Sequence, residues 1–85
     1  MATDAPLKLT VYGRNYCHLC EEMITALREL QRRFPFELVV ADVDADPGLE
    51  RRYGELVPVL AHGERELCHH RLDRRAVVEY LAKMP

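Results

Sequence analysis

Two cysteines separated by two residues, Cys17 and Cys20, form the pair in this 85-residue chain that is best suited to chemistry. They follow an apolar run that ends at Gly13, and they open a stretch of helical period. In such a turn the two sulfur atoms can reach each other, so the pair can alternate between two thiols and a disulfide. The first cysteine would meet free N–H groups and the positive dipole end of the helix, which favour its reactive thiolate form.

The helical spacing predicts different roles for the two sulfur atoms. We expect Cys17, at the helix start, to be accessible and to attack a substrate disulfide as a thiolate. Arg14 or a protonated His18 would stabilise that thiolate if either approaches it. Cys20 falls on the apolar stripe of the helix, so we expect it to be more buried and to act as the resolving thiol.

The pair must be positioned by the elements on either side of it, and the hydrophobic pattern predicts four strands and three helices. Strands are expected at residues 7–12, 36–43, 57–61 and 65–69. Helices are expected at residues 17–33, at 47–53 and after Asp73. Pro35 should end the first helix, while Asp46 and Asp73 should cap the other two.

These elements predict a single α/β domain over residues 1–85, with residues 1–6 flexible. A strand, a helix and a strand form a parallel βαβ unit, and the last two strands form a hairpin, which gives a mixed sheet of strand order 2-1-3-4 flanked by helices. The fourth strand should then end at the same sheet edge as Cys17. We expect Cys68 there as a small core residue, with a third redox thiol as the alternative. His69 and His70 are expected to form a solvated strand end, with a weakly basic rim that attracts an anionic substrate as the alternative.

This order of elements is the thioredoxin-like arrangement, and the chain resembles a small bacterial glutaredoxin-like protein along nearly its whole length. The run from Val11 to Cys20 is similar to the glutaredoxin strand and active-site motif, and Val57-Pro58 resembles the Val-Pro of the family. The resemblance implies thiol–disulfide exchange, a cis Val57–Pro58 bond and a main chain at Val57 that pairs with substrate. Two further matching runs are Asp44-Ala45-Asp46-Pro47 and Val57-Pro58-Val59-Leu60.

The chain also departs from the glutaredoxin pattern. His18 and Leu19 replace the usual Pro-Tyr between the cysteines, and the Gly-Gly pair that binds the glutathione backbone is absent. Tyr16 stands where thioredoxins carry tryptophan. The resemblance implies glutathione as a candidate co-substrate and substrate contacts at Arg14, Tyr16, His18, Val57, Pro58 and Asp73.

The charge, the apolar runs and the number of cysteines argue against several classes of protein. The net charge is −2 and the basic residues are scattered, which predicts no nucleic-acid surface. No apolar run approaches the roughly 20 residues that cross a bilayer, and the first six residues lack the features of a signal peptide. Three cysteines, an odd number, argue against a disulfide scaffold. We therefore expect a cytoplasmic monomer without membrane contact and without a resident cofactor.

The main hypothesis is a thiol–disulfide oxidoreductase that acts on disulfide-containing proteins or on glutathione mixed disulfides through Cys17 and Cys20. One alternative is a metal or iron–sulfur binding protein that uses Cys17. No metal site is assigned, because zinc would need a second ligand pair and only Cys68, His69 and His70 are candidates. The other alternative is a non-catalytic adaptor that keeps the thioredoxin fold.

Overall fold

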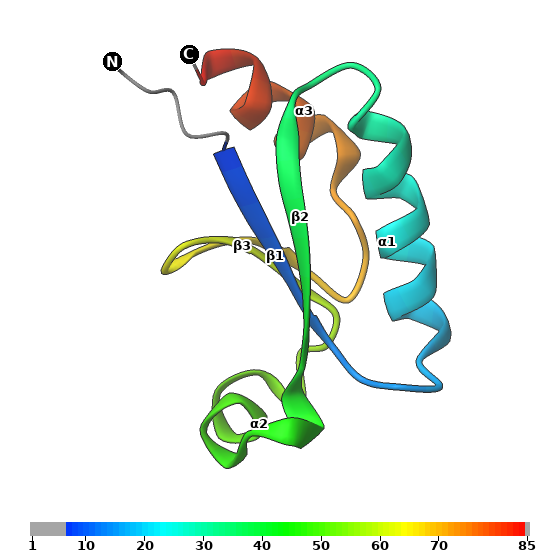
Figure 1. Ribbon diagram of the computed structural model, residues 1–85, viewed down its shortest axis with the longest axis vertical. Coiled ribbons are helices and arrows are strands. Elements are labelled where there is room, and N and C mark those ends of the chain that lie inside the picture. The colour runs from blue at the N-terminus through cyan, green and yellow to red at the C-terminus, as the bar shows by residue number, and fades with distance from the viewer. Residues whose placement is uncertain (1–6, 85) are drawn as a thin grey trace.

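The computed structural model describes residues 7–84 as one mixed sheet with helices packed against it (Figure 1). The expected flexible lead, residues 1–6, lies outside the described residues. In chain order the elements are β1 (Leu7–Gly13), α1 (His18–Leu30), β2 (Phe36–Asp42), the short 3-10 helix η1 (Val43–Ala45), α2 (Pro47–Tyr53), β3 (Val59–His62), β4 (Arg65–His69) and α3 (Arg74–Lys83).

The sheet has the strand order β2-β1-β3-β4. β1 and β2 are parallel, with Leu7 beside Phe36 at one end and Gly13 beside Asp42 at the other. β3 is antiparallel to both β1 and β4. The predicted strand order and strand directions are therefore confirmed, and Cys17 and Cys20 follow shortly after the end of an inner strand, β1.

The main core is formed by residues of the sheet and of the helices α1 and α3. It joins Leu9 and Val11 of β1 with Leu27 of α1 and Val77 of α3, all of them at most 1% exposed. A second, smaller cluster connects α2 to the sheet end near the active site. It consists of Val43, Tyr53 and Val59, with Tyr12 stacked on the Tyr53 ring at a centroid distance of 4.2 Å.

Several predicted boundaries move by a few residues. α1 ends at Leu30 instead of residue 33, because the N–H groups of Arg32 and Arg33 bond carbonyls three residues back and tighten the chain into turns. Gln31 fixes this exit, since its Nε2 donates to the carbonyl oxygen of Phe36 at 2.9 Å. β2 stops at Asp42, whose side chain caps η1 by accepting the N–H of Asp44 at 2.9 Å.

The second half of the chain follows the prediction with small changes. Asp46 caps α2, where its Oδ1 accepts the N–H groups of Gly48 at 2.7 Å and Leu49 at 3.4 Å. β3 begins at Val59 instead of residue 57. On α3, Ala76 is exposed, whereas Val78 packs against the core.

Across the part of the chain from residue 7 to residue 84, no helix has the length and apolar character to cross a membrane.

Candidate active site

Cys17 occupies the position immediately before α1. Its backbone is extended, with φ −109° and ψ 107°, and it is the N-cap residue of the helix. The backbone N–H of Cys20 donates a hydrogen bond to the Cys17 sulfur at 3.2 Å. A sulfur that already accepts a helix N–H at the positive end of the helix dipole is placed where a thiolate is stabilised.

Cys17 and Cys20 form a disulfide, and the Cα atoms of the two residues are 5.2 Å apart. Cys20 is only 3% exposed, whereas Cys17 is half-buried. This is the asymmetry that helical spacing predicts. A substrate arriving from solvent can therefore meet Cys17 but not Cys20.

Gly13 makes room for the buried sulfur, a role that the sequence interpretation did not assign to it. A Cβ atom at this position would lie 3.0 Å from the Sγ of Cys20 and 3.3 Å from its Cβ. Gly13 is the last residue of β1 and is itself buried. A glycine at a strand end often marks a close approach of this kind, which is the signal that could have found it.

Tyr16 and His18 flank Cys17 in the sequence and are both exposed. Tyr16 is fully exposed, and its φ of 59° lies in the left-handed region that residues other than glycine rarely adopt. His18 Nε2 lies 2.8 Å from Oε2 of Glu22, one turn further along α1. The His18 ring is thus paired with a carboxylate of its own helix.

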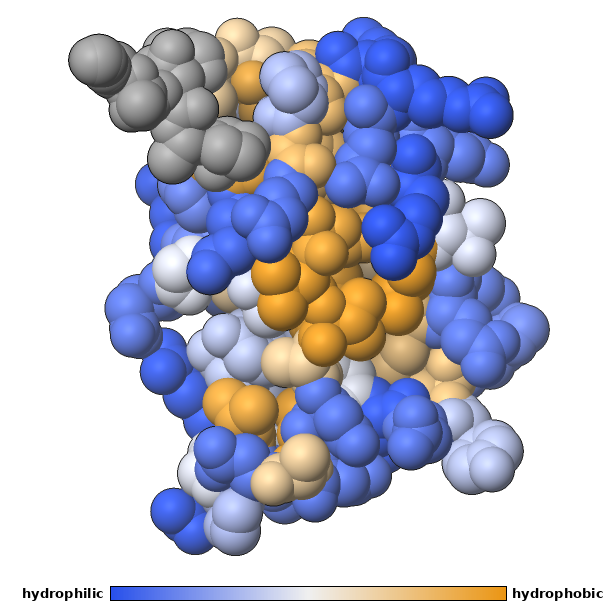
Figure 2. Space-filling view, in the orientation of Figure 1, coloured by the Kyte–Doolittle hydropathy of each residue, from blue (hydrophilic) through white to orange (hydrophobic). Residues whose placement is uncertain are grey.

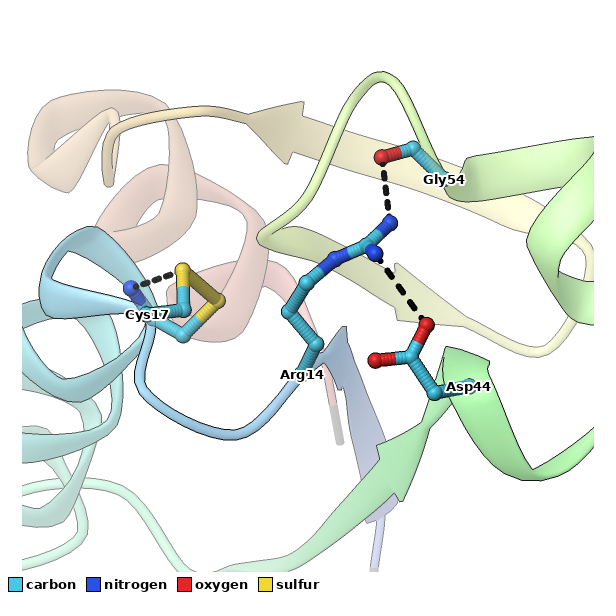
Figure 3. Close-up of a disulfide and its surroundings, with 5 residues drawn as sticks. Arg14, Cys17, Asp44 and Gly54 are labelled. Atoms are coloured by element: carbon cyan, nitrogen blue, oxygen red, sulfur yellow. Dashed lines mark hydrogen bonds and ion pairs between the residues drawn. A yellow bond between two sulfur atoms is a disulfide. The ribbon is translucent and has the colours of Figure 1, made fainter.

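Arg14 is turned away from the disulfide, contrary to the expectation that it could approach the Cys17 thiolate (Figure 3). Its guanidinium donates to Oδ1 of Asp44 at 3.1 Å, to Oε1 of Glu50 at 3.0 Å and to the carbonyl oxygen of Gly54 at 2.8 Å. Two carboxylates and one carbonyl satisfy the positive charge. In this structure Arg14 ties the active-site loop to η1 and α2.

Val57 and Pro58 lie at the same end of the sheet as the cysteine pair. Tyr12 pairs with Val59, so the two residues before Val59 run beside the end of β1. The Val57–Pro58 peptide bond is cis, Pro58 is buried and Val57 is half-buried. The carbonyl oxygen of Pro58 accepts the N–H of His70 at 2.8 Å, which fastens this segment to the chain after β4.

A family model described as "Glutaredoxin-like domain (DUF836)" matches residues 8–82. The chain belongs to this family. Protein Ne2328 from Nitrosomonas europaea is 47% identical, with a TM-score of 0.81, over 95% of this chain and 98% of its own. A structural genomics target protein from X. campestris is 33% identical, with a TM-score of 0.72, over 91% and 99% of the two chains.

A protein of much lower sequence identity has the same fold. Thioredoxin 1 from Thermosipho africanus is 18% identical, with a TM-score of 0.59, over 88% of this chain and 94% of its own. At that identity the likeness shows the fold alone, and it confirms the thioredoxin-like arrangement. None of the curated proteins compared with the chain matches it significantly.

Polar side chains also gather at and after the end of β4 in this glutaredoxin-like domain, at His69, His70 and Asp73. Asp73 caps α3 there, because its Oδ1 accepts the N–H of Ala76 at 3.1 Å. His69 Nδ1 lies 2.5 Å from Oε2 of Glu66, and His70 Nε2 donates to the carbonyl oxygen of Glu55 at 3.2 Å. Each of these polar side chains therefore has a local partner within the fold.

Cys68 behaves as a core residue of the domain. It pairs with Leu60 across the hairpin, and its side chain packs against the main hydrophobic core. Burial raises the pKa of the Cys68 thiol, which disfavours its thiolate form. Within residues 7–84, no group of three or more His, Cys, Asp or Glu side chains is arranged to hold a metal ion.

Proposed function

We propose that this glutaredoxin-like domain is a thiol–disulfide oxidoreductase, with Cys17 as the attacking thiol and Cys20 as the resolving thiol. The observation that supports it best is the pairing of a half-buried Cys17 at the N-cap with a buried Cys20 within disulfide distance. The accessible sulfur is the one that helix N–H groups stabilise as a thiolate. The protected sulfur reacts only after a substrate is attached to its neighbour.

The reaction starts from the reduced pair. The Cys17 thiolate attacks one sulfur of a substrate disulfide, that S–S bond breaks, and the other substrate sulfur leaves as a thiolate and takes up a proton. Cys20 then loses its proton and attacks the Cys17 sulfur of the mixed disulfide. The second substrate thiol is released and the Cys17–Cys20 disulfide forms. The two electrons that reduce the substrate thus come from the protein dithiol.

Substrate contacts are proposed where the fold gathers accessible groups around Cys17. The main chain at Val57, next to the buried Pro58, can pair with an extended substrate segment. Tyr16 and His18 contribute exposed side chains beside the nucleophile. Asp73 remains a candidate contact in addition to its capping role. Arg14 is instead given the role of holding the loop before Cys17, because its guanidinium already donates hydrogen bonds to three acceptors within the protein.

The reductant is proposed to be a soluble thiol. Two glutathione molecules would reduce the Cys17–Cys20 disulfide and leave as glutathione disulfide, so no resident cofactor is needed. Such a cycle suits a reducing compartment, and we place the protein as a monomer in the cytoplasm. The partners are disulfide-containing proteins or glutathione mixed disulfides.

A redox titration tests the proposal. The protein is equilibrated in buffers of varied glutathione to glutathione-disulfide ratio, and the mass of each species is recorded after acid quenching. We expect a reversible Cys17–Cys20 disulfide in the wild type and a stable glutathione adduct in Cys20→Ser. Cys17→Ser is expected to form neither, and Cys68→Ser should behave like the wild type. If no intramolecular disulfide forms at any ratio, the proposal fails.

Purification without air, followed by a visible spectrum and a zinc determination, distinguishes the oxidoreductase from the metal-binding alternative. A colourless protein with no bound zinc supports the oxidoreductase, whereas a visible iron–sulfur spectrum or stoichiometric zinc would contradict it.

A further inference from the structure

Two large hydrophobic side chains, Tyr16 and Val40, are exposed within residues 7–84, by 102% and 50% respectively. They come from different elements, the active-site loop and the edge strand β2, yet both line one groove of about 190 Å³. Cys20 and Ile24 of α1 line the same groove. The exposed apolar surface is therefore continuous with the proposed redox centre.

The position of β2 explains why this surface is uncovered. Val40 lies beside Val11 in the parallel register, so both side chains point to the face of the sheet that carries α1. Val11 on the inner strand is fully buried, whereas Val40 on the edge strand β2 is 50% exposed. Figure 2 shows hydrophobic side chains gathered over the middle of this view of the molecule, with hydrophilic side chains on both sides of them. An apolar patch that borders an unpaired strand edge is a natural contact surface.

The rim of the groove is acidic. Glu21 and Asp42 lie at its margin, and Arg14 is the cation there. The guanidinium of Arg14 is already paired with Asp44 and Glu50, so it contributes little free positive charge. An occupant with apolar and basic side chains therefore fits the groove better than an anion such as glutathione does.

We propose that the groove between β2 and α1 docks an extended, apolar and basic segment of a disulfide-containing protein substrate, an inference that rests on the proposed oxidoreductase function. An aliphatic or aromatic side chain of the segment packs on Val40, Ile24 and Tyr16. Flanking lysine or arginine side chains meet Glu21 and Asp42. The segment runs along the free edge of β2 towards Tyr16, which lines the groove and directly precedes Cys17 in the chain.

A second copy of this chain fits the same surface less well. β2 has an acidic residue near each end, Glu37 and Asp42. Two-fold pairing of β2 with itself is antiparallel and would place the acidic ends of the two strands near each other, which is unfavourable. A basic partner segment avoids this repulsion.

The test uses cysteine peptides joined to thionitrobenzoate by a disulfide. The Cys17 thiolate displaces the coloured thionitrobenzoate anion and binds the peptide, and Cys20 then releases the peptide thiol and forms the internal disulfide. One peptide carries leucine and lysines, and a second carries leucine and glutamates. The reference substrate is the mixed disulfide of thionitrobenzoate with a small neutral thiol. The rate of colour release is measured with reduced wild type, with Val40→Ser and with Val39→Ser. Val39 is the matched control, because it lies on the same strand but on the opposite face of the sheet.

For the wild type we expect the lysine peptide to react at least about tenfold faster than the glutamate peptide at low salt, and this preference should shrink as salt screens the acidic rim. Val40→Ser should lower the lysine-peptide rate about fivefold, as expected for a lost apolar contact, and Val39→Ser should leave it unchanged.

The reference substrate separates the two proposals. If the wild type does not react with it, the oxidoreductase function fails. If the reference reacts normally but the two peptides react equally, or both variants slow equally, the docking surface is refuted. A dimer that sediments at assay concentration and is lost only in Val40→Ser would overturn the proposal in favour of a second copy.

Discussion

Replacing Arg14 by glutamine tests the contacts that tie the active-site loop to α2. Arg14 joins three acceptors that lie 30 to 40 residues further along the chain: Asp44, Glu50 and the carbonyl oxygen of Gly54. Glutamine is shorter and uncharged, so it cannot form both ion pairs and the main-chain hydrogen bond. The variant therefore releases the loop between β1 and Cys17 from η1 and α2 in one step.

The expected loss of stability can be worked from these contacts. The side chains of Arg14, Asp44 and Glu50 are 32%, 53% and 48% exposed, so each ion pair is screened by solvent and is assigned about 0.5 kcal/mol. The part-buried hydrogen bond to Gly54 adds about 1 kcal/mol. The sum is about 2 kcal/mol, which corresponds to a fall in Tm of roughly 10 °C for a domain of this size.

Urea unfolding of the oxidised protein measures the effect, followed by far-ultraviolet circular dichroism because the chain has no tryptophan. In 1 M NaCl the ion-pair part should largely disappear, leaving a difference of about 1 kcal/mol from the hydrogen bond. Arg75→Gln is the control, since it loses only an exposed pair with Glu79 on the same helix. If Arg14→Gln is no more destabilising than Arg75→Gln at low salt, the reasoning is refuted.

Three further predictions concern single positions. Gly13→Ala should destabilise the oxidised protein by about 1–3 kcal/mol in urea unfolding, because the new Cβ meets the Cys20 sulfur at 3.0 Å; an unchanged midpoint would show that the sulfur can move aside. Asp46→Ala should cost about 1 kcal/mol by leaving two N–H groups of α2 without a partner, and circular dichroism with urea measures it; a neutral result would contradict the capping role. In the oxidised protein, alkylation of Cys68 by iodoacetamide should remain slow at pH 9.0, the ordinary pKa of the group, because its pKa is raised. The native state then keeps its proton longer than the unfolded chain does, so stability should fall as pH rises above 9.0, and Cys68→Ala should reduce this fall; a steeper fall in the variant would show that the sign is wrong.

The parts of the fold that sequence reasoning predicted are those encoded by local patterns. Alternation in residues 7–12 and the helical stripe that follows were sufficient to place Cys17 at a helix start and Cys20 on its buried side. The βαβ rule then supplied the parallel pairing of the first two strands. Helix boundaries were less accurate, because the end of α1 depends on a side-chain hydrogen bond from Gln31 to the next strand.

The charge arrangement around the site could not be predicted in the same way. Arg14 is adjacent to the active-site loop in sequence, which suggested a partner for the thiolate. Its partners Asp44 and Glu50 lie in η1 and α2, and only the folded chain brings them within reach. The role of Gly13 was missed for a related reason: only the folded chain brings the Cys20 sulfur close to this position.

The burial of Cys20 also determines how the redox centre would meet chemical damage. A peroxide molecule can reach Cys17 but not the sulfur behind it, which is 3% exposed. Oxidation of Cys17 would give a sulfenic acid, and Cys20 stands close enough to condense with it, releasing water and forming the internal disulfide. That disulfide can be reduced again, whereas the higher oxygen acids of cysteine form irreversibly in most proteins. The buried thiol would thus protect its neighbour from permanent loss under oxidative stress.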